Sequence, residues 1–371
     1  MPYKMIDLCA GIGGIRRGFE MTGQFQNVLS AEIDPHACKT YQHLYNNNPS
    51  NDVTDEAFKQ LVERTEYDVL LAGFPCQSFS RQGNGLGFAD ERRGIIFDHI
   101  AEIIERTRPK AIFLENVDNL VRHDKGHTFE VIIDTLERQL NYKVIGVSRT
   151  DDQLEYDGKN FIRNSKNFGV PQNRARTYIM AFNRRYFHEA TCNLPNELPS
   201  ANDLSLYTDL RDLLDMHAPA RYYLATGYYE TLLRHRARNH SKGNGFGCKV
   251  VNAPEIEHPI ASTILATGGS GRERNLVLDP QDGIAGSIYP GKLTPINKDC
   301  IRFMTPTEWG KLQGFIGYGF KDPATGVDKF SFPAGISVTQ QYKQFGNSVT
   351  IPVIKTMADF MLECFTRMQR L

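Results

Sequence analysis

Two side chains with the chemistry of catalysis follow two apolar segments of the sequence. Cys76 follows the apolar run YDVLLAG, and Glu115 follows the apolar run PKAIF. Both runs have the length and composition of buried strands. A thiolate can attack an electron-poor carbon, and a carboxyl group can donate or accept a proton. If the two strands are neighbours in one sheet, the thiol and the carboxylate face a common pocket.

Each of these residues also has a simpler interpretation. The seven cysteines are scattered and never form a C-x-x-C pair, whereas disulfide frameworks and zinc sites need closer, patterned spacing. No metal site is therefore expected, and Cys76 is left as either a packed thiol or a nucleophile. Glu115, followed by Asn116, could equally cap a helix. Both simpler interpretations are less favoured when Cys76 and Glu115 are considered together with the glycine turn described below.

The elements that must position these side chains alternate between strands and helices. KMIDL, NVLSAEID and the two apolar runs above indicate strands. Between the two runs, isoleucine repeats with helical spacing from Ile96 to Ile104. This alternation predicts an α/β fold with a mostly parallel sheet and helices on both faces. Ligands of such sheets bind beyond the carboxyl ends of the strands, where Cys76 and Glu115 are predicted to lie.

The alternation stops near residue 190 and returns near residue 300. Between these points the sequence is richer in Gly, Pro, Asn and Arg and shows little periodicity. This composition predicts a second, smaller domain with long loops. Pro352 is well placed to open a final helix. The apolar stripe of that helix consists of Val353, Met357, Phe360, Met361, Cys364 and Phe365.

A glycine turn follows the first predicted strand. Gly11, Gly13 and Gly14 let the backbone turn sharply and approach a ligand closely. The dinucleotide pattern G-x-G-x-x-G would need glycine where Arg16 stands, which weakens a nicotinamide interpretation. Glu32, at the end of the second strand, can accept hydrogen bonds from both ribose hydroxyls. Turn and carboxylate together favour a nucleoside ligand without a pyrophosphate, such as S-adenosylmethionine, over a purely structural turn.

Charge and hydropathy exclude some classes of protein and leave one question open. The 43 basic and 43 acidic residues cancel, so overall charge gives no indication of nucleic acid. No apolar run approaches the about 18–20 residues that cross a bilayer, and the N-terminus lacks a signal-peptide pattern. Locally, the stretch from Arg221 to Arg274 holds eight basic and four acidic residues, with RHRAR as its densest part. Such a run is as typical of a solvated helix face as of a phosphate-binding patch.

Taken together, the motifs resemble those of the DNA (cytosine-5) methyltransferase family. In order they are DLCAGIGG, AEID, GFPCQSF, ENV, PQNRAR, PTEWGKLQGF and QFGNSVTIP, and they span residues 7 to 354. The resemblance implies a Rossmann-like, S-adenosylmethionine-dependent methyltransferase fold with a mixed, mostly parallel sheet. It assigns residues 1–188 and 301–371 to a catalytic domain closed by the C-terminal segment. Residues 189–300 become a smaller, loop-rich target-recognition domain.

The resemblance implies methyl transfer from S-adenosylmethionine to carbon 5 of cytosine, within a specific short sequence of double-stranded DNA. Cys76 resembles the nucleophile that adds to carbon 6 and makes carbon 5 reactive. Glu115 resembles the acid that donates to N3, so burial is expected to raise its pKa. Arg174 and Arg176 are expected to contact the base carbonyl and orient the carboxylate. The target base cannot react inside a stacked duplex, so base flipping is expected.

The resemblance also implicates a set of residues in binding the cofactor. They are Asp7, Gly11, Ile12, Gly13, Gly14, Glu32, Ile33, Asp52, Val53, Pro75, Ile96, Asn347 and Val349. Asp52 is expected to accept a hydrogen bond from the adenine amino group. One position departs from the family pattern, because Cys9 stands where phenylalanine is usual. The loss of an aromatic face at this position is expected to weaken packing on the cofactor.

DNA contacts are expected from two glycine-rich stretches. SRQGNGLGFADERRG reads as a lid that closes over the flipped base, and ASTILATGGSGRERN resembles the core of a target-recognition domain. In the second stretch, Arg272 and Arg274 can grip guanine through O6 and N7 or hold phosphates. The expected DNA-binding residues are Ser80, Arg81, Gln82, Gln172, Thr263, Gly269, Arg272 and Arg274.

Other functions compete with this interpretation. The main alternative is an RNA (tRNA) cytosine-5 methyltransferase of the same architecture, whose members usually carry a Cys-Phe-Thr tripeptide. A non-catalytic DNA-binding module would not need Cys76, Glu115 and both arginines, and Arg16 disfavours a nicotinamide oxidoreductase. The resemblance implies double-stranded DNA as partner and allows a cognate restriction endonuclease. It favours a monomer without membrane contact in the bacterial cytoplasm, associated with the nucleoid when bound to DNA.

Overall fold

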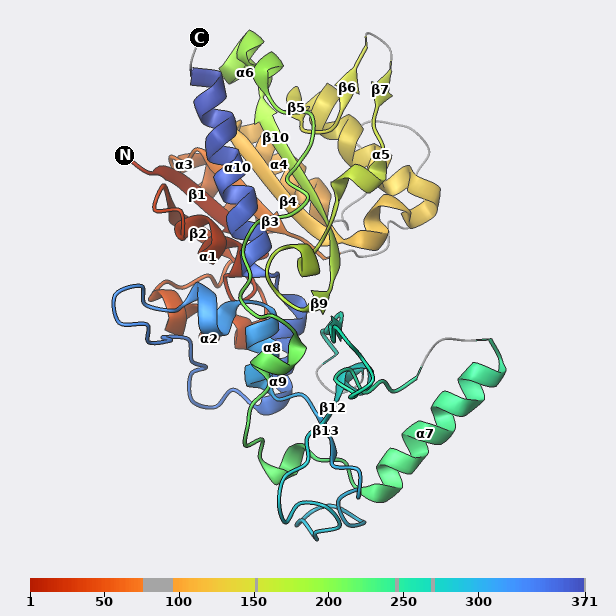
Figure 1. The fold of residues 1–371 in the computed structure, drawn as a ribbon. Coiled ribbons are helices and arrows are strands. Elements are labelled where there is room, and N and C mark those ends of the chain that lie inside the picture. Colours follow the sequence, from red (N-terminus) through yellow and green to blue (C-terminus); the bar gives the residue numbers. More distant parts are fainter. Residues whose placement is uncertain (76–95, 151–152, 244–246, 268–270, 370–371) are drawn as a thin grey trace. The chain divides into compact units, whose positions relative to one another are not determined.

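The computed structural model describes residues 1–75, 96–150, 153–243, 247–267 and 271–369 (Figure 1). The chain forms two compact units, which we describe separately. The sheet unit comprises Met1–Asn164, Ala175–Asn202 and Val353–Leu371, and the loop-rich unit comprises Ser165–Arg174 and Asp203–Pro352. The predicted boundaries at 188/189 and 300/301 come from the functional domains of the resembling family, whereas the two units are defined by packing. The predicted boundaries therefore stay a prediction.

The sheet unit is built on a seven-stranded mixed sheet, which confirms the predicted α/β fold. Its strands follow the order β2-β1-β3-β4-β10-β5, and β8 also pairs with β10. They are β1 (Tyr3–Leu8), β2 (Phe25–Ala31), β3 (Val69–Gly73), β4 (Ala111–Val117), β5 (Tyr142–Val144), β8 (Ile162–Asn164) and β10 (Ala175–Asn183). The pairings among β1 to β4 are parallel, whereas β10 is antiparallel to β4, β5 and β8. Most strands therefore run in one direction.

Helices cover both faces of this sheet, as the alternation predicted. The helices of this unit are α1 (Gly14–Glu20), α2 (Pro35–Tyr45), α3 (Glu56–Arg64), α4 (Ile96–Thr107), α5 (His127–Asp134), α6 (Arg184–Phe187) and α10 (Ile351–Gln369). On one face, Ile112 belongs to the main hydrophobic cluster with residues of α3, α4 and α5. On the other, Phe113 contacts Phe19 of α1, and Phe182 contacts Phe365 of α10, with ring centroids 5.3 Å and 5.6 Å apart. The faces are thus filled by packing, and the strand ends are where a ligand can bind.

Local signals explain where several of these helices begin. Asp34 caps α2 by accepting hydrogen bonds from the backbone N–H groups of His36 and Ala37, and Pro35 occupies the first position of the helix. The predicted final helix is α10, with Pro352 in its first turn. In Figure 1, α10 crosses in front of the sheet. Its stripe is core, since Val353, Met357 and Met361 are fully buried.

The loop-rich unit has little regular structure, also as predicted. Its longer helices are α7 (Thr226–Ser241), α8 (Pro306–Leu312) and α9 (Val338–Asn347). Its short strands are β9 (Gln172–Asn173), β11 (Ala261–Ser262), β12 (Leu276–Leu278) and β13 (Ile301–Phe303). β9 pairs in parallel with β11, and β12 pairs antiparallel with β13. Such short ladders cannot hold a unit of this size together, so side-chain contacts must contribute.

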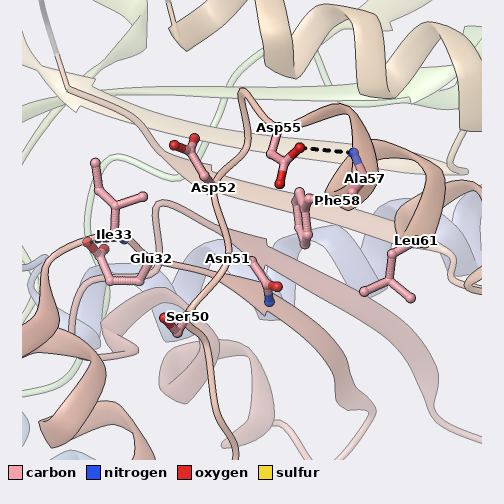
Figure 2. A pocket seen from close by; sticks show the side chains of 9 residues that line it. All are labelled: Glu32, Ile33, Ser50, Asn51, Asp52, Asp55, Ala57, Phe58 and Leu61. Atoms are coloured by element: carbon pink, nitrogen blue, oxygen red, sulfur yellow. Dashed lines mark hydrogen bonds between the residues drawn. The ribbon is translucent and has the colours of Figure 1, made fainter.

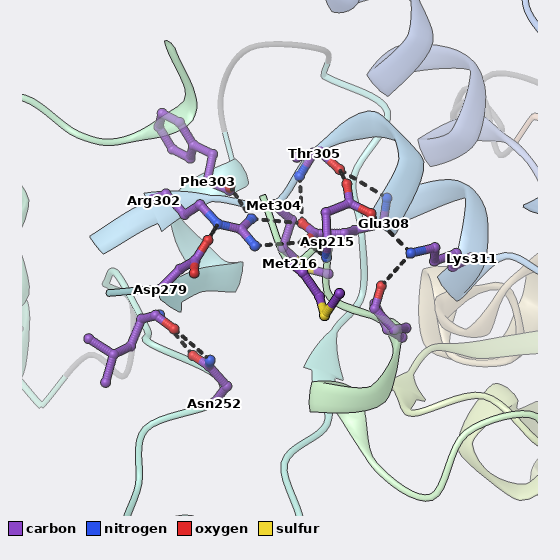
Figure 3. A network of polar contacts seen from close by, with 12 residues as sticks. Asp215, Met216, Asn252, Asp279, Arg302, Phe303, Met304, Thr305, Glu308 and Lys311 are labelled. Atoms are coloured by element: carbon purple, nitrogen blue, oxygen red, sulfur yellow. Dashed lines mark hydrogen bonds and ion pairs between the residues drawn. The ribbon is translucent and has the colours of Figure 1, made fainter. Parts of the chain in front are cut away.

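A buried ion-pair network supplies part of that support (Figure 3). The Arg302 guanidinium donates to both carboxylate oxygens of Glu308, at 2.9 and 2.8 Å, and to Asp279 at 2.6 Å. Arg302 and Glu308 are both fully buried. Glu308 also completes a capping box with Thr305 at the start of α8. One buried network thereby joins β13, the loop after β12 and the first turn of α8.

Candidate active site

The two predicted chemical side chains follow strands that are neighbours in the sheet. β3 pairs in parallel with β4, and Gly73 lies opposite Glu115. The Asn116 side chain reaches across and donates to the carbonyl oxygen of Phe74 at 2.9 Å. Cys76 lies three residues beyond Gly73, outside the described residues. The two strand ends are therefore adjacent, which was the condition for a common site, while the position of the thiol stays a prediction.

Glu115 is nearly buried and is held beside an arginine. Its side chain lies 3.4 Å from Nε of Arg176, and the two side chains are 11% and 13% exposed. The following short helix begins without a side-chain cap, so the alternative role of Glu115 as a helix cap is not supported. Burial disfavours a charged carboxylate, whereas the nearby guanidinium favours it. The expected rise in the pKa of Glu115 therefore stays a prediction.

The second predicted arginine has a different environment. Arg174 belongs to the loop-rich unit and is 2% exposed. It donates to the carbonyl oxygens of Ile264, Gly346 and Ser348, at 2.9, 3.1 and 2.5 Å. The two arginines of QNRAR thus fall in different units. Arg176 lies beside the Glu115 carboxylate, whereas Arg174 holds together backbone segments of its own unit. The expected roles of the two arginines toward a base stay a prediction.

The glycine turn is stabilised by an arginine and two tyrosines. Gly13 has φ of 77°, and a Cβ atom there would lie 2.3 Å from the Tyr45 ring. The Tyr45 hydroxyl donates to the Gly13 carbonyl at 2.6 Å. Arg16 lies over that ring, 4.1 Å from its centroid, and donates to the Tyr41 hydroxyl at 3.1 Å. The arginine that breaks the dinucleotide pattern therefore helps to fix the turn.

Glu32 connects the same turn to the end of β2. Its carboxylate accepts from the backbone N–H of Gly11 at 2.7 Å, and from those of Ile33 and Asp34 at 2.9 and 2.7 Å. A carboxylate has about four acceptor positions. These three bonds leave one of them for a ligand hydroxyl. Glu32 is thus pre-oriented by the backbone and suits one ribose hydroxyl better than two.

A pocket of about 510 Å³ opens beside Glu32 (Figure 2). Its lining consists of Glu32, Ile33, Ser50, Asn51, Asp52, Asp55, Ala57, Phe58 and Leu61. Ile33 is 70% exposed, which is unusual for an aliphatic side chain and suits a surface that covers a flat ring. Asp52 accepts from the N–H and hydroxyl of Thr54 through Oδ1, at 2.8 Å in both cases. The carboxylates and apolar side chains fit a nucleoside with ribose and base amino groups.

Part of this pocket comes from residues that the sequence did not single out. Ser50 and Asn51 belong to the stretch NNNPSND, in which only Asp52 was expected to contact the cofactor. Asn51 donates from its amide to the carbonyl of Ser30 at 2.7 Å, which fixes the loop against β2. Asp55 begins α3 by accepting from the N–H of Ala57 at 3.1 Å. The cluster of Asn, Ser and Asp after a helix was the available signal, because such residues form turns at ligand-bearing strand ends.

Two further residues near the turn are shielded to different degrees, because Asp7 is buried whereas Cys9 is half-buried. Asp7 is 0% exposed, and neither of its carboxylate oxygens has a hydrogen-bond partner among the described residues. Burial raises the pKa of Asp7 well above its usual value. Burial, together with the charge of Glu32, raises the pKa of the Cys9 thiol to about 12. The sequence predicts a direct contact between Asp7 and the cofactor. Because Asp7 is fully buried, this contact would require the turn to move.

The other predicted cofactor residues fall in several environments. Gly11 has φ of 56°, and nothing lies within 4 Å of a Cβ built on it. Ile12 and Val53 are buried, Ile96 packs against the main cluster, and Pro75 is exposed. Gly14 begins α1. In the loop-rich unit, Asn347 ends α9 and is exposed, whereas Val349 is 5% exposed.

The predicted DNA-binding residues of the loop-rich unit separate into buried and exposed ones. Gln172 is fully buried; its Oε1 accepts from the N–H of Ile264 at 3.3 Å, and its Nε2 donates to the Leu312 carbonyl at 3.1 Å. It therefore positions the segment that follows Thr263 and offers no surface to DNA. Thr263 donates from its hydroxyl to the carbonyl of Asn173 at 2.7 Å. Ser80, Arg81, Gln82 and Gly269 lie outside the described residues, as does the predicted lid.

The two candidate base-reading arginines also differ from each other. Arg272 lies over the rings of Phe303 and Tyr342, with its guanidinium carbon 4.5 and 5.1 Å from their centroids. Arg274 is exposed. Stacking on two rings favours a supporting role for Arg272. Arg274 is thus the better candidate for contacting a base.

Comparison with known proteins decides the family. The family model described as C-5 cytosine-specific DNA methylase matches residues 3–363. The chain belongs to this family. Type II methyltransferase M.HpaII of Haemophilus parainfluenzae is 39% identical to it over 369 residues, which cover 97% of this chain and 89% of the relative. The DNA-cytosine methyltransferase of Escherichia coli (strain K12) is 34% identical over 388 residues, covering 97% and 77%.

Solved structures agree on the fold. A Spodoptera frugiperda DNMT2 mutant matches with a TM-score of 0.64 at 18% identity, over 97% of this chain and 99% of the other. Entamoeba histolytica methyltransferase EhMeth matches with a TM-score of 0.61 at 17% identity, over 98% of each chain. The methylase is therefore a DNA (cytosine-5-)-methyltransferase with the methyltransferase fold, and its family is S-adenosylmethionine-dependent.

One short motif bears on the alternative of an RNA methyltransferase. A Cys-Phe-Thr tripeptide occurs at Cys364–Thr366, inside α10. Cys364 is fully buried, and Phe365 stacks on Tyr3 with ring centroids 4.4 Å apart. Core packing thus explains the tripeptide in this chain.

Among the described residues, no helix is long and apolar enough to span a membrane.

Proposed function

We propose that this methylase modifies carbon 5 of cytosine within a specific short sequence of double-stranded DNA, through base flipping and a transient bond between Cys76 and carbon 6. The observation that carries the proposal is the register of β3 with β4, which sets Gly73 opposite Glu115. Three residues of extended chain reach about 10 Å. The Cys76 thiol is therefore within reach of the Glu115 carboxyl group.

The chain's own residues would act in the following order. The Cys76 thiolate adds to carbon 6 of the flipped cytosine, and the electron pair of the C5–C6 double bond moves into the ring toward N3. Glu115 donates a proton to N3, so the ring becomes an enamine whose carbon 5 is nucleophilic. Arg176, 3.4 Å from Glu115, orients that carboxyl group. After methylation, a water molecule takes the C5 proton, its electron pair re-forms the C5–C6 double bond as the C6–S bond breaks and frees the Cys76 thiolate, and the N3 proton returns to Glu115.

S-adenosylmethionine supplies the electrophilic methyl group when it is bound. Glu32 would accept from one ribose hydroxyl, because three of its acceptor positions already hold backbone N–H groups. Asp52 would accept from the adenine amino group, and Ile33 would cover the ring. These assignments rest on the pocket that the three residues share (Figure 2).

The proposal is tested by separating binding from chemistry. Cys76→Ser should abolish methyl transfer and keep specific binding to duplex DNA. A duplex with 5-fluorocytosine at the target position should trap the wild-type protein covalently, because fluorine cannot leave as a proton does. Cys192→Ser is the matched control, since Cys192 is an exposed thiol in the same unit. Near-normal turnover by Cys76→Ser would refute the covalent step.

The relatives are named type II methyltransferases, which supports the proposal that this methylase works together with a cognate restriction endonuclease. We propose that the methylase acts on bacterial chromosomal DNA, and, as a separate proposal, that it does so as a monomer. Bisulfite sequencing of host DNA from cells that express the chain would reveal the methylated sequence. An endonuclease that cuts this sequence should then fail on DNA from the same cells. Methylation without a common sequence would contradict the proposal.

A further inference from the structure

The helix α7 has a composition that packing does not explain. None of its sixteen residues is buried. A helix that is polar around most of its surface usually bridges solvent, is stabilised by many ion pairs, or binds a partner. The sequence left open whether its basic residues form a solvated face or a phosphate-binding patch. The contacts of its two halves distinguish these possibilities.

The N-terminal half of α7 is anchored to the rest of the loop-rich unit. Tyr229 and Leu232 pack against a cluster that includes Leu276 of β12. Tyr228 donates from its hydroxyl to the carboxylate of Glu273 at 2.9 Å. Glu273 belongs to the short helix Arg272–Asn275, which carries both candidate base-reading arginines. The direction of α7 is thereby fixed relative to the segment expected to read DNA.

The C-terminal half carries a row of cations. Arg234 and Arg238 of α7 and the C-cap residue Lys242 are spaced four residues apart, so they lie on one side of the helix, about 6 Å apart along its axis. All three are exposed. Among the described residues none of them forms an ion pair, and Arg234 donates to the Thr231 hydroxyl at 3.0 Å. In Figure 1, α7 extends away from β12 and β13 of its own unit.

The helix dipole accounts for only part of this row. Cations near a helix C-terminus are favourable, but the effect falls off within the last turn. Arg234 lies seven residues before the end of α7 at Ser241, about two turns away. Like charges four residues apart repel each other by a few tenths of a kcal/mol. The row therefore has a cost in the isolated chain that a polyanion would remove.

We propose that Arg234, Arg238 and Lys242 bind consecutive phosphates of the DNA backbone beside the recognition sequence, so that α7 supplies sequence-independent affinity. The proposal rests on the proposed function for the identity of the polyanion. Three flexible cations in a row suit evenly spaced phosphates, and the row contains no amide or carboxylate to read base edges. The methylase would then use α7 to hold DNA and a different segment to choose the sequence.

The test is the salt dependence of DNA binding by the full chain with Arg234→Gln, Arg238→Gln and Lys242→Gln combined. Each phosphate contact contributes about 0.9 to the slope of log affinity against log salt, so the slope should fall by about 2.7. Between 50 and 200 mM salt, the wild type should lose about 40-fold more affinity than the variant. The fall in slope should be equal for cognate and unrelated duplexes. Turnover at saturating DNA and the methylated sequence should not change.

The matched control combines Arg138→Gln, Arg185→Gln and Arg367→Gln, which removes the same charge from exposed positions of the sheet unit. This control should leave the slope unchanged. An unchanged slope in the α7 variant, or an equal fall in the control, overturns the proposal. A loss confined to the cognate duplex also overturns it, because that would indicate base reading. If the wild type methylates no duplex yet the slope falls as expected, the proposed function fails and the role of α7 stands.

Discussion

The two units hold their functional residues by different means. In the sheet unit, main-chain register decides which residues meet, as for Gly73 and Glu115. In the loop-rich unit, buried side chains hold backbone segments directly, as Arg174 and Gln172 do around Ile264. A pair of strands spreads its stability over many backbone hydrogen bonds. A single buried side chain can instead hold two or three backbone segments together by itself. Substitutions should therefore act mainly on chemistry in the first unit and mainly on stability and DNA binding in the second.

The largest expected effect follows from the buried ion pair of the loop-rich unit. Arg302→Ala should lower the free energy of unfolding by about 3–5 kcal/mol, because it leaves Glu308 buried without its partner. Denaturant unfolding measures the change. The control is Lys355→Ala at an exposed i,i+4 pair with Asp359, which should cost less than about 1 kcal/mol. Equal losses in the two variants would remove the contrast between buried and surface pairs.

The two arginines of one motif test the contrast between units directly. Arg176→Met should lower kcat about 100-fold, since a misplaced Glu115 loses its alignment, with little change in unfolding. Arg176→Lys should recover part of the rate. Arg174→Met should instead cost about 2 kcal/mol of stability, because buried carbonyls lose their donor, and should raise KM for DNA. The contrast fails if Arg174→Met affects kcat alone.

A glycine in the loop-rich unit gives a smaller effect. A Cβ atom at Gly346 would lie 2.3 Å from the carbonyl oxygen of Leu265, a backbone atom that cannot easily move. Gly346→Ala should therefore cost about 1–3 kcal/mol and weaken binding to the cognate duplex. Gly227→Ala is the control, because its Cβ would meet Thr294 at an ordinary 3.5 Å. Calorimetry and a binding titration of both variants provide the comparison.

The smallest expected effect is a dependence on pH in the sheet unit. Burial raises the pKa of Asp7 in the folded state, so the folded protein favours the protonated carboxyl. Its contribution to stability is fully present below the unfolded pKa of about 3.9 and is lost as pH rises toward the folded pKa. Asp7→Asn removes this loss. The difference in unfolding free energy, variant minus wild type, should increase from about pH 4 upward.

This measurement uses only the slope of that difference, because a buried asparagine adds a constant cost of its own. Titrating groups that do not interact with Asp7 cancel between the two proteins. A difference that does not change with pH would show that Asp7 titrates normally.

By itself, the sequence determined the α/β fold, the two strands that lead to Cys76 and Glu115, the turn with Glu32 and the family. Apolar runs and spacing report strands and helices because burial imposes a period on local sequence. Only the tertiary structure decided which unit each arginine of QNRAR joins, that Gln172 and Asp7 are buried, and that Arg272 stacks on two rings. The partners of Arg174 lie 90, 172 and 174 residues away in sequence. No local pattern specifies contacts at that distance, since they depend on how distant segments pack together.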